Sequence, residues 1–414
     1  MLSRINNCER LNDCRPERHG EKNNWHGQPA FMILHIAPDD KFVPFLQGLF
    51  EEALTGESMW RVLTCKPVPA FAVPAEGMEV VGNEYYGSEK FKSDLQVADC
   101  VIFHSMNLSN WQKLQVLSRI PVKMPIIWRG WGFDYYGILQ ANGLRLLLPE
   151  TSLLIKRSSI LERFFVRQLP RKLLNAIFLK TAAPVIANKL IARIDYFSCC
   201  VPGDYDALKR ALPNFKAQFL PLNYYSVEDI FLKGDGLQDL TGEDILLGNS
   251  ATPANNHIEV MRALGKLGLQ GRKVIVPLSY GDMKYQERII QAGKDLLGES
   301  FIPLADYMPL PEYNRFVSSC GILIMNHIRQ QAMGNISAAL LRGGKVFLRT
   351  ENPIYGYYTR LGVKLFPFSD NITIASLDAP LNREDIRTNK AIMSKIWSRS
   401  QGIENVKAIM RLEK

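Results

Sequence analysis

The chain has 414 residues, of which 47% are hydrophobic and 22% are charged, and its formal net charge is +9. This length is too great for one hydrophobic core, so we expect two domains of ~150–200 residues each. No apolar run is long enough to span a bilayer, and the positive charge favours an anionic partner such as a nucleotide, a nucleic acid or a membrane surface. The seven cysteines form no C-x-x-C pair, which indicates reduced thiols rather than disulfides or a zinc site.

Residues 1–31 form a polar, charge-balanced head without hydrophobic periodicity. The head lacks the apolar stretch of a secretory signal, and we expect it to be disordered. Met32 opens the first apolar run, so it is a candidate for the biological start of the protein.

Residues 32–232 alternate short apolar runs with amphipathic segments, which predicts a doubly wound α/β domain. Three helices are expected. The first ends near residue 54, and the others cover residues 111–120 and 205–212. The expected strands are residues 32–36, 61–63, 78–81, 99–104, 125–128 and 196–201.

Polar side chains accompany three of these strands. His35 lies in the first strand, His104 ends the strand 99–104, and Asp134 follows the strand 125–128. Ligands of such sheets bind at the carboxyl ends of the strands. A single buried histidine is more often structural than functional, but three polar groups at three strand ends favour a site.

Residues 152–194 carry nine Lys or Arg and one acid, Glu162. Lys156, Arg163 and Arg167 recur at spacings that place them on one helical face, and Arg171 and Lys172 follow. Large apolar residues are interleaved with these cations. The segment is interpreted either as a binding surface for an anionic membrane or as a packed helix pair with a solvated basic face.

Asp204-Tyr205-Asp206 has the D-x-D pattern of a metal-binding sugar transferase. The pattern stands at the start of an expected helix, where acids are stabilised by the helix dipole. We therefore expect a helix-terminal role and no metal ion.

Residues 233–243 are an expected linker, residues 244–400 a second Rossmann-like domain, and residues 401–414 a C-terminal helix or tail. The second domain repeats a strand, a loop and a helix, with helices over 255–266 and 283–297. Neither domain has a dinucleotide fingerprint or a P-loop. The expected strands are residues 244–247, 273–276, 301–304, 321–325 and 345–348.

Residues 320–353 organise the second domain. A strand leads into His327, Arg329, Gln330 and Gln331, and Gly334 then opens a helix over residues 336–341. Free backbone N–H groups at the helix start attract anions, and Arg329 adds a positive charge. The pattern fits a phosphate or diphosphate site, although an ordinary loop with a glycine cap has the same local sequence.

At finer grain the sequence resembles glycosyltransferase family 56, the bacterial 4-acetamido-4,6-dideoxygalactose transferases. The resemblance extends over residues 32–400, and the head and the long basic segment depart from it. It implies the GT-B fold, in which two Rossmann-like doubly wound domains face a central cleft. The matching stretches are Ile33-Leu34-His35, Phe103-His104, WRGWGFDYY from Trp128, Leu247-Gly248-Asn249-Ser250, His257, Val276-Pro277 with Tyr280, Arg329-Gln330-Gln331 with Gly334, and Glu351-Asn352-Pro353.

The resemblance implies a dTDP-linked amino sugar as donor and a polyprenyl-diphosphate-linked saccharide as acceptor. For an inverting reaction it implies a base, for which Asp134 is the first candidate, His104 the second, and His35 a supporting residue. We expect neither a metal ion nor another cofactor, so backbone N–H groups and side chains must stabilise the leaving diphosphate. The expected donor-site residues are Gly248, Asn249, Ser250, Tyr280, Arg329, Gln330, Gln331, Gly334, Glu351 and Asn352.

Such an acceptor places the enzyme at the cytoplasmic face of the bacterial inner membrane as a peripheral protein, in assembly of a surface polysaccharide like enterobacterial common antigen. Two alternatives stay open. One is another nucleotide-sugar enzyme on the same fold, such as a fucosyltransferase that uses a guanine nucleotide. The other is a non-enzymatic protein that binds nucleic acid or membranes through its basic segment, although few aromatic residues accompany the cations, which argues against nucleic acid.

Overall fold

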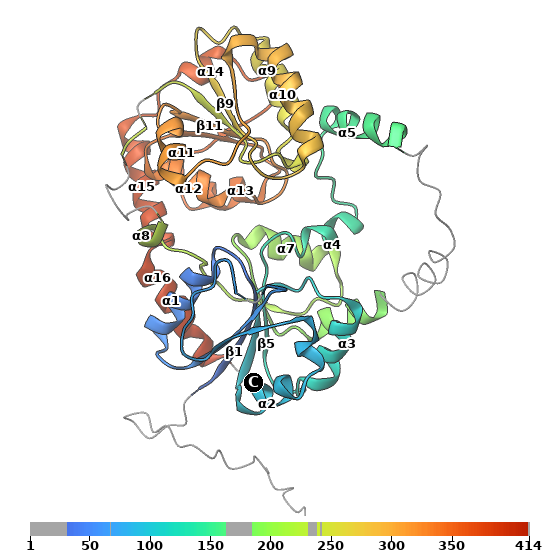
Figure 1. Ribbon diagram of the computed structural model, residues 1–414. Coiled ribbons are helices and arrows are strands. Elements are labelled where there is room, and N and C mark those ends of the chain that lie inside the picture. The colour runs from blue at the N-terminus through green and yellow to red at the C-terminus, as the bar shows by residue number, and fades with distance from the viewer. Residues whose placement is uncertain (1–30, 67, 163–183, 231–237, 241, 413–414) are drawn as a thin grey trace, which may run out of the picture.

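The computed structural model describes residues 31–66, 68–162, 184–230, 238–240 and 242–412. The expectations for the head, for about half of the basic segment (residues 163–183) and for most of the linker therefore lie outside the described residues. These include the proposed membrane contacts of Arg163, Arg167, Arg171 and Lys172. The described residues fold into two lobes, one above the other in Figure 1.

The first lobe is built on a parallel sheet of seven strands in the order β3-β2-β1-β4-β5-β6-β7. Its strands are β1 (Ile33–Pro38), β2 (Ser58–Leu63), β3 (Met78–Val81), β4 (Cys100–Phe103), β5 (Ile126–Arg129), β6 (Tyr196–Ser198) and β7 (Gln218–Phe219). Its helices are α1 (Val43–Ala53), α2 (Glu89–Val97), α3 (Asn110–Arg119), α4 (Tyr136–Ala141), α7 (Pro202–Ala211) and α8 (Val227–Ile230), with a 3-10 turn at Asn83–Gly87.

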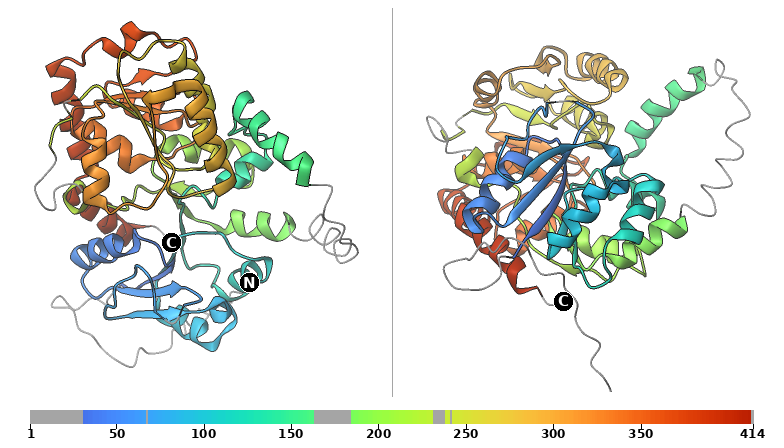
Figure 2. Two further views of the ribbon diagram at one scale, coloured as in Figure 1. Left: turned by 45° about the horizontal axis from the view of Figure 1, so that its top comes forward. Right: turned by 60° about the horizontal axis from the view of Figure 1, so that its bottom comes forward.

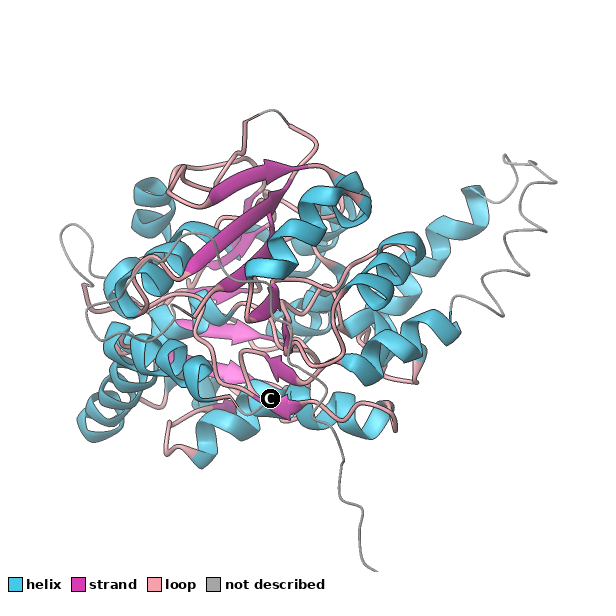
Figure 3. Cartoon of the chain, turned by 90° about the horizontal axis from the view of Figure 1, so that it is seen from below, coloured by secondary structure: helices cyan, strands magenta, loops and turns pink. Residues whose placement is uncertain are grey.

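The second lobe contains a parallel sheet of six strands in the order β10-β9-β8-β11-β12-β13. Its strands are β8 (Ile245–Leu247), β9 (Val274–Pro277), β10 (Phe301–Leu304), β11 (Ile322–Met325), β12 (Lys345–Leu348) and β13 (Phe366–Pro367). Its helices are α9 (His257–Gly265), α10 (Met283–Leu297), α11 (Leu310–Val317), α12 (Met333–Leu341), α13 (Pro353–Arg360), α14 (Ile374–Asp378) and α15 (Arg383–Ile396). Helices lie on both sides of the strands (Figure 3).

Each sheet has a switch point, where successive strands go to opposite sides of the first strand. The first switch point lies between β1 and β4, because β2 and β3 continue the other way. The second lies between β8 and β11, because β9 and β10 do the same. Loops diverge at such points and leave room for a ligand at the carboxyl ends of the strands. The expected fold of two doubly wound domains is confirmed.

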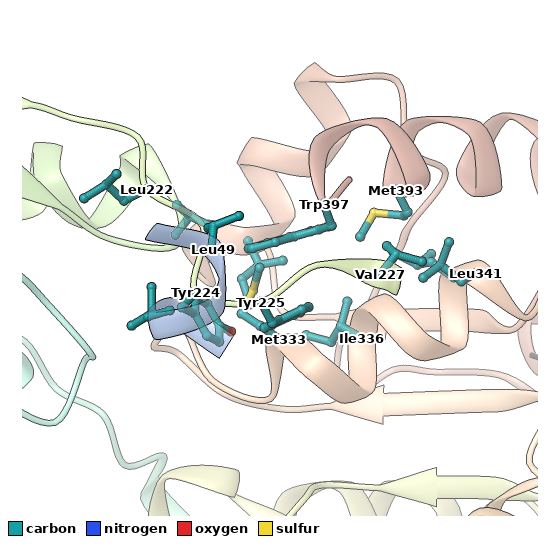
Figure 4. Packing of buried hydrophobic residues seen from close by; sticks show 14 of the residues in the cluster. Leu49, Leu222, Tyr224, Tyr225, Val227, Met333, Ile336, Leu341, Met393 and Trp397 are labelled. Carbon is teal, nitrogen blue, oxygen red and sulfur yellow. The ribbon is translucent and has the colours of Figure 1, made fainter. Parts of the chain in front are cut away.

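The two lobes share one hydrophobic cluster (Figure 4). The ring of Trp397 stacks on Tyr225 at a centroid distance of 4.9 Å, and Met333 and Ile336 of α12 belong to the same cluster. After α15 the chain returns to the first lobe, where α16 (Arg399–Lys407) packs on α1 and Arg399 pairs with Glu52. The C-terminal segment therefore fastens the two lobes together.

Helix α5 (Pro149–Glu162) belongs to the first half of the sequence but packs against α9 of the second lobe (Figures 1 and 2). The hydroxyl and backbone N–H of Thr151 donate to the buried carboxylate of Glu259, at 2.7 and 2.9 Å. Leu154 and Ile155 contact the hydrophobic core of that lobe. The described start of the basic segment is thus a packed helix on one of its faces.

Many of the helices and strands expected from the sequence are present in the structure. The bounds of β3, β12, α10 and β10 agree with the sequence expectations. Other bounds differ from the expectations by one to three residues. Helix α12, for example, begins at Met333 rather than residue 336, because Ala332 takes a left-handed conformation with φ 60° and starts the helix early. Strand β6 ends at Ser198 rather than 201, because Pro202 already forms the first turn of α7.

Candidate active site

At the second switch point, the loop after β8 is held by the buried side-chain amide of Asn255. Gly248 has φ +69°, and a Cβ there would lie 2.6 Å from Nε2 of His257. The side chain of Asn255 accepts a hydrogen bond from the backbone N–H of Asn249 at 3.0 Å and donates to the carbonyl of Ser250 at 3.0 Å. The loop therefore follows the buried side chains closely, which explains the glycine at 248.

The loop after β11 is tied to the same amide. Nε2 of His327 lies 2.8 Å from Oδ1 of Asn255, and the side-chain amide of Asn352 donates to the carbonyls of His327 and Arg329. Burial lowers the pKa of His327, and that of His257, to about 3. Both rings are therefore neutral. Nδ1 of His327 and Nε2 of His257 are buried without a hydrogen-bond partner.

Three predicted donor-site residues from three different loops bond to one another. The Gln331 amide donates to Oδ1 of Asn249 at 2.9 Å, and the Asn249 amide donates to the Tyr280 hydroxyl at 3.0 Å. Tyr280 is 57% exposed, so the polar chain reaches solvent. Ser250, by contrast, is buried and bonds to Thr252. The structure thus gathers Asn249, Tyr280 and Gln331 at one rim.

The start of α12 borders this rim. Met333, Gly334 and Asn335 form its first turn, whose backbone N–H groups have no partner within the helix. A Cβ on Gly334 would meet no atom within 4 Å, so space is open above this turn. The arrangement suits an anionic group.

Arg329 and Gln330 face the other lobe. The Arg329 guanidinium lies 4.9 Å from the ring centre of Tyr136, and the backbone N–H of Gln330 donates to the Tyr136 hydroxyl at 2.7 Å. A Cβ on Gly132 would lie 3.4 Å from Nη2 of Arg329. These residues therefore join the second switch point to the loop after β5.

Glu351 and Asn352 lie at the start of α13. The half-exposed carboxylate of Glu351 accepts a hydrogen bond from Arg349 at 2.9 Å. Burial alone would raise the pKa of Glu351, but the bond from Arg349 keeps it below its usual value. Asn352 is fully buried and caps α13 through Ile354, so its described contacts are all within the protein.

At the first switch point, His35 and His104 form a buried pair. Nδ1 of His35 lies 3.0 Å from Nε2 of His104, and the His35 ring stacks on Trp60 at 4.0 Å. Burial lowers the pKa of His104 to about 3 and lowers that of His35 well below its ordinary value. Both predicted residues are therefore neutral, and neither has an exposed edge.

Asp134 binds three N–H groups. Its Oδ2 accepts from the Trp128 indole at 2.7 Å and from the Met106 backbone at 3.1 Å, and its Oδ1 accepts from the Trp131 backbone at 2.9 Å. Burial raises the pKa of this half-buried carboxyl even though these N–H groups act to lower it. Asp134 therefore joins the loops after β4 and β5 and is also a carboxylate with an elevated pKa.

Asp204 has a role that the sequence expectation missed. Its buried carboxylate accepts hydrogen bonds from the hydroxyls of Tyr135 and Tyr136, and Tyr136 in turn accepts from Gln330 of the other lobe. Burial raises the pKa of Asp204 to about 6, although both tyrosines act to lower it. The N-cap of α7 is Val201, and Asp204 lies in the first turn of that helix, which agrees with the expected helix-terminal position of this acid. Local sequence signals do not predict these hydrogen bonds, because Asp204 is 69 positions from Tyr135 and 68 positions from Tyr136.

Comparisons with known proteins agree with this architecture. Residues 186–380 match the family model described as 4-alpha-L-fucosyltransferase glycosyl transferase group 56. HepE of Anabaena, solved in complex with UDP and glucose, superimposes with a TM-score of 0.57 at 10% identity, over 92% of this chain and 99% of that one.

Two further solved structures share the fold. Sucrose-phosphate synthase from Thermosynechococcus elongatus has a TM-score of 0.60 at 9% identity, over 92% of this chain and 98% of that one. A glycosyltransferase from Rickettsia africae has a TM-score of 0.59 at 11% identity, over 92% and 99%.

Proposed function

We propose that this chain, whose residues 186–380 match the group 56 glycosyltransferase model and which has the GT-B fold, is a glycosyltransferase. In this proposal it transfers a 4-acetamido-4,6-dideoxy sugar from a dTDP-sugar to a polyprenyl-diphosphate-linked saccharide. The family match favours an enzyme over the non-enzymatic alternative. The proposal is carried by one observation: the polar rim of Asn249, Tyr280 and Gln331 lies beside the open first turn of α12, at the switch point that faces the first lobe.

In the proposed donor complex, the diphosphate lies on the first turn of α12 and the rim orients the rest of the nucleotide-sugar. Arg329 is close enough to the first lobe to meet a diphosphate in the cleft, and its positive charge stabilises the leaving group. Glu351, held by Arg349, accepts a hydrogen bond from the nucleoside sugar. HepE has been solved with UDP-glucose, which supports a nucleoside diphosphate sugar as the class of donor.

In the proposed reaction, Asp134 takes the proton of the acceptor hydroxyl as that oxygen bonds to the anomeric carbon. The bond from the anomeric carbon to the diphosphate oxygen breaks, and the nucleoside diphosphate leaves with the electron pair. An elevated pKa makes a carboxylate a better base near neutral pH. Oδ1 of Asp134 accepts a hydrogen bond from the Trp131 backbone, and a further lone pair on this oxygen can accept the proton. Trp131 connects Asp134 to His104, since its backbone N–H donates to Asp134 and its indole donates to the carbonyl of His104. His35 is bonded to His104 in turn.

A fucosyltransferase is the second candidate, because the matching family model is described as a 4-alpha-L-fucosyltransferase. Fucose and the 4-acetamido sugar are both 6-deoxy sugars, so one binding pocket could accept either. The two proposals differ in the nucleotide, which is dTDP for one and a guanine nucleotide for the other.

A thermal-shift comparison of dTDP, GDP and UDP tests the donor proposal, because a ligand that binds only the folded state raises Tm by mass action. We expect the largest rise with dTDP. A larger rise with GDP would replace the first candidate by the fucosyltransferase, and no rise with any of the three would contradict the proposed donor site.

The acceptor proposal implies work at the cytoplasmic face of the inner membrane. Within the described residues, no helix is long and apolar enough to cross a bilayer. Lys156 is exposed near the middle of α5. This helix projects beside the second lobe (Figure 2). Changing Lys156, Arg163 and Arg167 to Gln should abolish sedimentation with anionic liposomes at low salt, since each cation near an anionic leaflet contributes about 1 kcal/mol. Wild-type protein that ignores such liposomes would contradict this docking.

A further inference from the structure

Four polar side chains lie together on one face of the first sheet. His104, Arg129 and Ser198 form a row across β4, β5 and β6, and His35 of β1 lies one step behind that row, level with Ile102. Strands alternate their side chains between two faces. Ile33, Ile102, Ile127 and Tyr196 belong to the cluster shared by the two lobes. Two residues further along each strand, on the same face, come His35, His104, Arg129 and Ser198, in the order of the adjacent strands β1, β4, β5 and β6.

Three members of this row have buried atoms without a partner. Arg129 is fully buried, and its Nη1 donates to the carbonyl of Gly130 at 2.7 Å. Within the described part of the chain its Nε and Nη2 have no hydrogen-bond partner by geometry, and the guanidinium also interacts with the Cys200 thiol. Nδ1 of His104 and Oγ of Ser198 are also buried without a hydrogen bond. Buried polar atoms are nearly always paired in native proteins, so three such residues on adjacent strands indicate a ligand.

The charge of Arg129 also lacks a counterion. Within the described ranges, no carboxylate forms an ion pair with it, whereas Arg61 of the same sheet is held by the buried carboxylate of Asp94 at 2.7 Å. The guanidinium lies 5.3 Å from the ring centres of Trp131 and Tyr224. Burial raises the pKa of the neighbouring Cys200 thiol more than Arg129 lowers it, so that thiol stays neutral.

The histidine pair can supply a hydrogen-bond donor at the same place. Nε2 of His35 lies 3.3 Å from Oγ of Ser58, and Nδ1 of His35 lies 3.0 Å from Nε2 of His104. If the Ser58 hydroxyl donates to His35 and His35 donates to His104, Nε2 of each neutral ring accepts one hydrogen bond and the proton of His104 is on Nδ1. That N–H then points away from His35 with no protein acceptor.

One aromatic layer separates this row from the boundary between the lobes. The Trp131 indole donates to the carbonyl of His104, and its half-buried ring stacks on Phe42 at 5.6 Å. Gly132, the next residue, borders Arg329 and Gln330 of the other lobe. A displacement of the Trp131 ring would therefore open the row toward Arg329 and Gln330 of the other lobe.

We infer that Arg129, Ser198 and the Nδ1–H of His104 bind one phosphate group, which is the diphosphate of the acceptor when the enzyme is at work. A phosphate oxygen matches the planar fork of an arginine and accepts from a hydroxyl and an imidazole N–H at once. The source of the phosphate rests on the proposed function, whereas the anion site itself rests on the unpaired atoms. Neither Arg129 nor Ser198 was singled out by the sequence.

The first test compares two buried arginines in the ligand-free protein. Replacing an unpaired buried charge by an apolar side chain of similar length is neutral or stabilising, whereas replacing a paired one strands its partner. Arg129→Met should therefore leave Tm unchanged or raised, and Arg61→Met, the matched control, should lower Tm. A Tm for Arg129→Met that falls as far as that of Arg61→Met would show a structural role and overturn the inference.

The second test measures binding of farnesyl diphosphate, inorganic pyrophosphate and farnesol to the full chain, with and without saturating dTDP. We expect both phosphates, but not farnesol, to bind the wild type. Arg129→Met should weaken both at least tenfold and Ser198→Ala severalfold, and dTDP affinity should stay within twofold. Equal binding of farnesyl diphosphate by wild type and Arg129→Met, or no binding of either phosphate, would overturn the anion site.

The same experiment separates the sources of the phosphate. Pyrophosphate binding that persists without any binding of farnesyl diphosphate would contradict the acceptor assignment, and so would displacement of farnesyl diphosphate by dTDP. If dTDP fails to bind the wild type, the donor proposal fails, yet the titrations without nucleotide still decide on Arg129.

Discussion

The two switch points share one topology but differ in how their polar groups are treated. At the second, Gln331, Asn249 and Tyr280 bond in a chain that reaches solvent, and the first turn of α12 opens onto free space. At the first, His35, His104 and Arg129 are fully buried under an aromatic layer, and Arg129 pairs with no carboxylate among the residues that the structure describes. The comparison shows that the second domain has an open polar surface. In the first domain the polar groups are buried, and the aromatic layer would have to move before a ligand could reach them.

The largest expected effect is at the first switch point. Asp134→Asn should cut turnover by about 10²–10⁴-fold, because the amide cannot take the acceptor proton. Binding of dTDP, measured by calorimetry, should be nearly unchanged, since Asp134 is in the other lobe. If the variant keeps more than about a tenth of the wild-type rate, Asp134 has only the structural role of joining two loops. His104 would then be the next candidate for the general base.

The link between the two switch points should depend on pH through Asp204. Burial raises its folded pKa from 3.8 to about 6, so the native protein holds a proton that the unfolded chain releases over this range. Asp204 therefore contributes to the free energy of unfolding fully at pH values below 3.8. This contribution is lost as pH rises through the folded pKa of about 6, by up to about 3 kcal/mol.

Denaturant unfolding of wild type and Asp204→Asn between pH 4 and 7 measures this contribution as the difference between the two proteins. The difference is needed because the buried histidines, whose pKa values are lowered, change stability in the opposite direction over the same range. A difference that does not vary with pH would mean that Asp204 does not titrate there.

At the second switch point, Arg329→Ala should weaken binding of dTDP by about 1.5–3 kcal/mol, the scale of a charge-assisted hydrogen bond. Calorimetry measures the affinity, and Arg262→Ala is the control, because Arg262 pairs with Glu150 on α5 rather than at the rim. Equal affinities for the wild type and a folded Arg329→Ala would remove Arg329 from the donor site and weaken the contrast between the two regions.

The smallest effect is expected from the head, which belongs to neither region. A chain that begins at Met32 should match the full chain in Tm and in turnover, because residues 1–30 have no apolar face to bury. A clear fall in Tm would show that the head packs on the body.

Several features of this protein were predictable from local sequence. Strands such as β12 and helices such as α10 are specified by hydrophobic period and by flanking glycine or proline, which act over a few residues. The residues at the second switch point were predictable too, because each follows its own strand and parallel strands bring such positions to one edge. Asn249, Tyr280 and Gln331 are found together for that reason.

What the tertiary structure alone decided involves residues far apart in the chain. The packing of α5 on the opposite lobe, the return of α16 to α1 and the bonds of Asp204 to two tyrosines join segments that no period connects. The lack of a counterion at Arg129 is of the same kind, since a sequence shows which charges exist but not which ones meet. Pairing of buried charges depends on distances across the fold, and only the packed sheet fixes those distances.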